Sequence, residues 1–123
     1  MKAFLLFLIS IFCIKLSTAQ SNQVNRLPAG KYETFYKSNQ NKWERGDIIL
    51  IDESKYKLSS GNETGEYKFS VTAQRVFFIT GALKSLYAKT YLNNSDPVIV
   101  LPVAENQQLG LKLPSEIWGH YRH

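Results

Sequence analysis

From Gly30 onward, short runs rich in aromatic and β-branched residues alternate with clusters of turn-forming residues. The runs recur about every 8 to 12 residues, the spacing typical of an all-β protein built from sequential hairpins. No segment sustains a helical period and strands do not alternate with helices, which disfavours a Rossmann-type nucleotide-binding fold. The predicted strands are residues 31–37, 43–51, 55–59, 65–71, 75–80, 87–92 and 98–103, with 109–113 as a candidate eighth.

The fold class that follows is all-β: a small up-and-down meander barrel of about seven or eight strands, or a compact β-sandwich. The four residues from Tyr56 (Tyr-Lys-Leu-Ser) return eleven positions later from Tyr67 as Tyr-Lys-Phe-Ser. This repeat predicts that the third and fourth strands pair as a hairpin with one buried face. The barrel domain is predicted over residues 30–113, after a flexible lead-in at 20–29 and before a C-terminal tail at 114–123.

The first 19 residues have the three parts of a secretory signal peptide. Lys2 supplies the positive start, an apolar run of twelve residues follows, and Ser17 and Ala19 provide small residues before a cut at Gln20. The apolar run is shorter than the roughly 20 residues needed to span a bilayer. We therefore expect cleavage rather than an uncleaved anchor, a secreted or periplasmic location, and no stable membrane insertion after cleavage.

Composition narrows the picture further. Loss of the signal peptide leaves 104 residues without a cysteine, because Cys13 is the only one in the sequence. A domain of this size in an oxidising compartment then depends on its apolar core instead of on disulfides. Without Lys2 and Lys15, 13 basic residues face 10 acidic ones, a net charge of +3. The basic residues are scattered along the chain, so no nucleic-acid partner is expected.

Four segments follow a strand-and-turn pattern that reads roughly G-x-Y, G-x-I-x-L, G-x-Y and I-x-F-x-x-G-x-L: Gly30–Tyr32, Gly46–Leu50, Thr64–Tyr67 and Val76–Leu83. This pattern resembles that of small secreted barrels of the lipocalin-like and avidin-like kind. The resemblance runs from Gly30 to about Leu86 and implies a barrel whose strands follow in sequence. It carries over no ligand residue, because Tyr32 stands where the lipocalin Gly-x-Trp motif has tryptophan, and only Trp43 and Trp118 are present where avidins have a larger set.

Catalytic chemistry has little support in the residues. The only histidines, His120 and His123, lie in the last four positions, where a frayed polar terminus is a simpler interpretation than a metal site. No Gly-x-Ser-x-Gly nucleophile motif occurs. The enzyme hypothesis that remains is a hydrolase using the carboxylate pair Glu44 and Asp47. We accordingly assign no catalytic residue, no metal ligand and no cofactor.

Aromatic residues are the more informative set. Aromatic side chains combine a broad contact surface with, in Tyr and Trp, a polar tip. The leading hypothesis is non-enzymatic binding of a small or extended ligand, a small molecule or a glycan, at an aromatic-lined barrel mouth. The candidate ligand-binding residues are Trp43, Tyr36 and Tyr87, each near a predicted strand end. A filled interior, common in barrels this small, would shift weight away from this hypothesis.

Three runs are apolar on both faces of their predicted strands: residues 48–51, 76–79 and 98–101. Such strands need cover on the outer face too, either from the C-terminal segment (Leu113, Ile117 and Trp118) or from a protein partner or second copy. The alternative function is therefore a secreted protein–protein interaction module, an inhibitor or a surface-assembly subunit. Its candidate interface residues are Ile49, Ile51, Phe77, Ile79 and Trp118.

Overall fold

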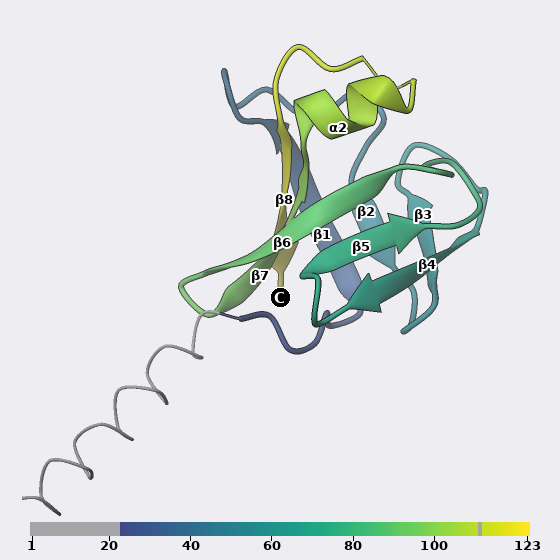
Figure 1. The fold of residues 1–123 in the computed structure, drawn as a ribbon, viewed down its shortest axis with the longest axis vertical. Helices are drawn as coiled ribbons and strands as arrows, with labels where there is room; N and C mark the ends of the chain where they lie inside the picture. Colours follow the sequence, from purple (N-terminus) through teal and green to yellow (C-terminus); the bar gives the residue numbers. More distant parts are fainter. Residues whose placement is uncertain (1–22, 111) are drawn as a thin grey trace, which may run out of the picture.

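The computed structural model describes residues 23–110 and 112–123, which form a closed antiparallel barrel of eight strands in sequence order (Figure 1). The predicted up-and-down meander is confirmed, and the sandwich alternative is wrong. The predicted signal peptide, residues 1–19, lies outside the described residues. The elements are β1 (Gly30–Tyr36), β2 (Ile48–Leu50), β3 (Lys55–Leu58), β4 (Gly65–Ser70), β5 (Arg75–Phe78), β6 (Tyr87–Asn93), β7 (Asp96–Leu101), α2 (Val103–Gln108) and β8 (Ile117–Arg122).

Strand residues alternate between the inside and the outside of the barrel, as the period of two requires. In β3 and β4, Tyr56 and Tyr67 are buried, while the following lysines Lys57 and Lys68 are not. The two tyrosine rings meet edge to face with centroids 6.5 Å apart. The two strands pair as an antiparallel hairpin, so the prediction from the sequence repeat is confirmed.

Side chains fill the barrel interior. Inward-facing residues from all eight strands join one hydrophobic cluster, and an eight-stranded barrel is just wide enough for such a filling. Three of these residues are tyrosines whose hydroxyls donate to backbone carbonyls near the barrel ends: Tyr32 to Pro28, Tyr56 to Thr80 and Tyr67 to Asp52. Burial raises the pKa of Tyr67 to about 12.

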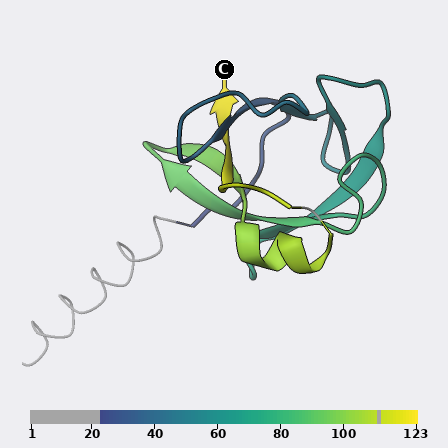
Figure 2. The same ribbon diagram turned by 90° about the horizontal axis from the view of Figure 1, so that it is seen from above.

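Two segments outside the strands lie near opposite ends of the barrel (Figure 1). At one end lie residues 23–29, part of the segment predicted as a flexible lead-in. They pack against the barrel, because Val24 and Leu27 are buried in the core cluster. The backbone of Val24 also exchanges two hydrogen bonds with the side-chain amide of Gln74, at 2.9 and 2.8 Å. At the other end lies α2, which Figure 2 shows beside the ring of strands.

One buried polar side chain fastens α2 to the barrel. Asn106 is fully buried; its amide oxygen accepts the Tyr87 N–H at 3.2 Å, and its amide nitrogen donates to the carbonyls of Tyr87 at 3.0 Å and Pro102 at 3.1 Å. Pro102, predicted to lie in the seventh strand, is the N-cap of α2 instead. Because proline lacks the N–H that a strand ladder needs, it ends β7 and precedes the helix.

The closing strand lies later in the chain than predicted. It is β8 (Ile117–Arg122), not residues 109–113, so the segment predicted as a tail completes the barrel. β8 pairs with β1 over six residues and with β7 over four. β2 is also shorter than the predicted 43–51, since the chain before it turns at Gly46, whose φ is +92°.

Candidate functional site

The three residues predicted to line a barrel mouth have three different surroundings. Trp43 is 3% exposed and belongs to the core cluster, so it does not line an open mouth. Tyr36 donates its hydroxyl to the Glu44 carboxylate, and this bond raises the pKa of Tyr36 to about 12. Tyr87 lies on the outer face of β6, with its ring centroid 6.3 Å from that of Phe77.

An outer face of the barrel gathers aromatic side chains from β1, β6 and β8 over β7. The strand register places Phe35 of β1 opposite Trp118 of β8, and Trp118 opposite Val100 of β7. Val98 lies in the same way between His120 and Tyr91. We call this surface the Trp118 face; its six residues are Phe35, Tyr91, Val98, Val100, Trp118 and His120.

The rings of the Trp118 face lie close together. Tyr91 and Trp118 are within 16° of parallel with centroids 6.2 Å apart, and the His120 ring lies 6.0 Å from that of Trp118. The outward-facing Val98 and Val100 are only 1% exposed, whereas Tyr91 is 48% exposed. The flanking rings thus shield the valines from water, and the face offers solvent its aromatic rings and little aliphatic surface.

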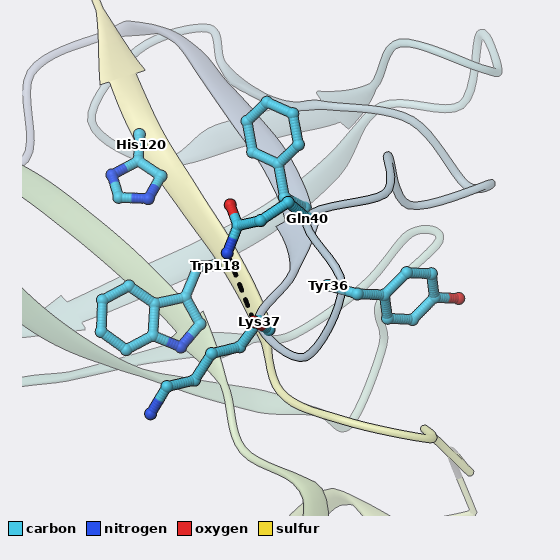
Figure 3. A pocket seen from close by; sticks show the side chains of 6 residues that line it. Tyr36, Lys37, Gln40, Trp118 and His120 are labelled. Carbon is cyan, nitrogen blue, oxygen red and sulfur yellow. Dashed lines mark hydrogen bonds between the residues drawn. The ribbon is translucent and has the colours of Figure 1, made fainter.

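A hollow of about 260 Å³ opens to solvent beside Trp118 (Figure 3). In Figure 3 the Tyr36 phenol points away from Trp118, whereas the Lys37 side chain passes close to it. The Lys37 ammonium lies 5.3 Å from the centroid of the indole. The volume falls just below the roughly 300–1,000 Å³ of pockets for drug-sized ligands, so the hollow suits one unit of a longer molecule. Its lining residues are Phe35, Tyr36, Lys37, Gln40, Trp118 and His120.

Ion pairs surround the Trp118 face. Glu116 binds Lys37 and also accepts the indole N–H of Trp118 at 3.1 Å, which fixes the orientation of the indole. Each basic side chain in the surrounding pairs has a carboxylate within 4 Å, so this face is not a basic patch. The pairs are Lys37–Glu116 at 3.8 Å, Lys42–Asp47 at 2.5 Å, Lys89–Glu105 at 3.6 Å, Arg122–Glu33 at 2.8 Å and His123–Asp96 at 2.9 Å.

His120 brings a neutral polar group to the same face. Burial lowers its pKa, the Arg122 charge lowers it further, and Glu33 opposes the shift. The imidazole is therefore neutral at pH 7, with one nitrogen that donates and one that accepts a hydrogen bond. The prediction of a frayed C-terminus is wrong for this residue, because His120 lies inside β8.

The predicted interface residues fall into two groups. Trp118 lies opposite Val100 of its own chain. This agrees with the prediction that the C-terminal segment covers the outer face of the barrel. Trp118 does so, however, as part of strand β8 and not from a tail. Ile51, Phe77 and Ile79 are 45, 43 and 46% exposed, and Ile49 is half-buried. The second group therefore leaves apolar surface open on β5 and after β2.

The carboxylates of the hydrolase hypothesis serve separate contacts. Glu44 binds Tyr36 at the surface. Asp47 is buried and accepts from the Lys42 ammonium at 2.5 Å and the Thr34 N–H at 3.1 Å. Burial opposes its ionisation, but these contacts outweigh burial and hold the pKa of Asp47 below its usual range. Asp47 thus fastens the loop before β2 to β1.

Within residues 23–110 and 112–123, no three His, Cys, Asp or Glu side chains are grouped so that they could hold a metal ion. The same residues contain no helix with the length and apolarity to cross a membrane.

The sequence pattern does not single out Phe35, Tyr91 or His120 as site residues. The sequence feature that could have identified part of this site is the period of two along a strand, which puts Trp118 and His120 on one side of β8. The missing information is the pairing of β8 with β1, which brings residues more than 80 positions apart into contact.

Comparison of the chain with protein-family models, with curated proteins and with solved structures finds no match. Its function must therefore be inferred from its own residues and their geometry.

Proposed function

We propose that this protein is an exported, non-enzymatic binding protein that holds an extended ligand against the Trp118 face, outside a filled barrel. Export is supported by the signal-peptide pattern of residues 1–19. The likeness to lipocalin-like and avidin-like barrels extends in this proposal to secretion and ligand binding, but not to a ligand inside the barrel.

The observation that carries the proposal is the pairing of Tyr91 with Trp118 on the outside of the barrel. Tyr91 is 48% exposed although its ring lies nearly parallel to that of Trp118. Large exposed aromatic groups in a hollowed, polar-rimmed surface are typical of interaction sites. Trp43 and the inward tyrosines have the opposite character, since the core buries them.

Nuclear magnetic resonance of the ¹⁵N-labelled protein tests the proposal with two internal reporters. The indole N–H of Trp118 lies at the proposed site, while that of Trp43 belongs to a buried ring. The probes are a neutral oligosaccharide mixture, an acidic oligosaccharide mixture and a mixture of short peptides. We expect at least one probe to shift the Trp118 signal with the Trp43 signal unchanged. No Trp118 shift with any probe refutes the proposal.

A second candidate is the protein–protein interaction module, because Phe77 and Ile79 expose apolar surface on and after β5. In this case the peptide mixture should shift the backbone signals of Phe77 and Tyr87 and leave the Trp118 indole unmoved. Lys89 separates this surface from Tyr91 along β6, so the two sets of signals report on different sites.

A further inference from the structure

The charges around the Trp118 face indicate which ligand chemistry it accepts. Four basic side chains around it, Lys37, Lys42, Lys89 and Arg122, each lie within 4 Å of a carboxylate. A fifth carboxylate, Asp96, pairs with the imidazole of His123, and Lys31 lies on β1 opposite Arg122. The surroundings of the face therefore carry at least as much negative as positive charge when histidine is neutral. The surroundings therefore offer an anionic ligand no excess of positive charge, although the whole chain has a formal charge of +5.

The apolar part of the face has the wrong shape for an aliphatic partner. Val98 and Val100 are 1% exposed, so the accessible apolar surface consists of ring faces and edges. The exposed aliphatic side chains that a protein partner could pack against do not belong to this face; they are Ile51 and Ile79. Flat ring surfaces match the flat apolar faces of sugar rings, whose hydroxyls project sideways toward polar groups at the rim.

Polar groups suited to hydroxyls lie at that rim. Gln40 and neutral His120 line the hollow and can each donate and accept. The Lys37 side chain is 61% exposed and meets Glu116 at only 3.8 Å. Since exposed ion pairs of this kind contribute little stability, Lys37 is free to leave the indole and donate to a ligand oxygen.

We infer that the ligand of the Trp118 face is an uncharged carbohydrate chain, with one sugar ring in the hollow beside Trp118 and the next against Tyr91. This inference rests on the proposed function, since it names the ligand class of the same site. It involves no bond making or breaking. Because the hollow is open and the face extends over four strands, successive sugar rings of the chain would lie side by side along the barrel surface.

Affinity electrophoresis of the protein produced from the full chain tests the ligand class. Native gels contain a neutral polysaccharide (galactomannan, xyloglucan or dextran) or an acidic one (polygalacturonate or alginate). We expect at least one neutral polysaccharide to retard the protein and neither acidic one to do so. Tyr91→Ala should weaken the retardation about tenfold or more, and because Tyr91 is half exposed, this variant should fold normally. Trp118→Ala, checked by circular dichroism, should behave in the same way.

The matched control is Phe77→Ala, which removes a similarly exposed aromatic ring from a different outer face and should leave the retardation unchanged. Retardation by the acidic polysaccharides alone, lost in Tyr91→Ala, overturns the inference and leaves the proposed function standing. Retardation by no neutral polysaccharide also overturns the inference; the indole signal of Trp118 then decides whether the proposed function falls with it. Retardation that Phe77→Ala abolishes and Tyr91→Ala preserves overturns both.

Discussion

Asn106 offers the sharpest test of how α2 is attached to the barrel. Its side chain is fully buried and makes three hydrogen bonds, all to backbone groups that lie on β6 or just before α2. Asn106→Ala removes all three hydrogen bonds at once. The N–H and carbonyl of Tyr87 and the carbonyl of Pro102 then lose the side-chain amide that they bind. The alanine cannot replace these bonds.

The expected loss follows from the number of bonds. A buried hydrogen bond contributes a net 0.5–1.5 kcal/mol, so three of them amount to about 3 kcal/mol. For a domain of this size, each kcal/mol lowers Tm by roughly 4–8 °C, which gives a fall of about 12–24 °C. Urea unfolding followed by tryptophan fluorescence measures the loss, because Trp43 moves from the core to water on unfolding.

The neighbouring amide supplies the control. Gln107 is in the same helix and is exposed, so Gln107→Ala removes an amide without removing a buried bond. We expect this variant to stay within about 0.5 kcal/mol of the parent protein. If Asn106→Ala also stays within that range, Asn106 does not fasten α2 and the reasoning from the three bonds is refuted.

Three further predictions address the close packing at Gly81, the N-terminal segment that packs on the barrel, and the acid sensitivity of the protein. Gly81→Ala should cost about 2 kcal/mol or more in urea unfolding, because at φ +88° the added Cβ would lie 2.6 Å from a backbone atom; Gly61→Ala, with open space around it, should cost under about 1 kcal/mol. Leu27→Ala should cost about 2 kcal/mol, and a cost near zero in thermal unfolding would mean that the N-terminal segment does not pack on the barrel. Because the folded-state pKa of Asp47 is lowered, its contribution is present above about pH 4 and is lost as the pH falls through the folded value. Asp47→Asn should therefore destabilise the protein at pH 7 and have a smaller effect at pH 2.5; an equal effect at both pH values would contradict this assignment.

Most of the fold could be predicted from the sequence because its signals are local. The alternation around Tyr56 and Tyr67 fixes which residues face inward, and the turn residues fix sequential pairing. The closing strand escaped this reasoning since its pairing with β1 joins the two ends of the barrel, and no local pattern records such a contact. A glycine at 119 and two histidines also gave β8 the composition of a polar tail.

The candidate site was harder to predict for a related reason. A rule that assigns aromatic residues near strand ends to a barrel mouth cannot distinguish a residue that lines an open mouth from one that is buried in the core. Trp43 is part of the core, in a segment before β2 that is held against β1 by the Phe35–Lys42 bridge and the Trp43 N–H bond to Thr34. Tyr87 faces outward because β6 begins in that register. The Trp118 face, in contrast, depends on the register of four strands at once.

The interior tyrosines give an energetic reason for placing the proposed binding site on the outside of the barrel. Tyr32, Tyr56 and Tyr67 fill the barrel, and each hydroxyl holds a backbone carbonyl at one of its ends. A ligand entering the barrel would have to displace these rings and leave their partners unsatisfied, at about 1–3 kcal/mol for each buried group in addition to the lost packing. A ligand on the Trp118 face meets rings that already stand in water and displaces at most the weakly held Lys37 side chain. The same fold that makes the interior stable therefore leaves the outside as the surface where binding costs least.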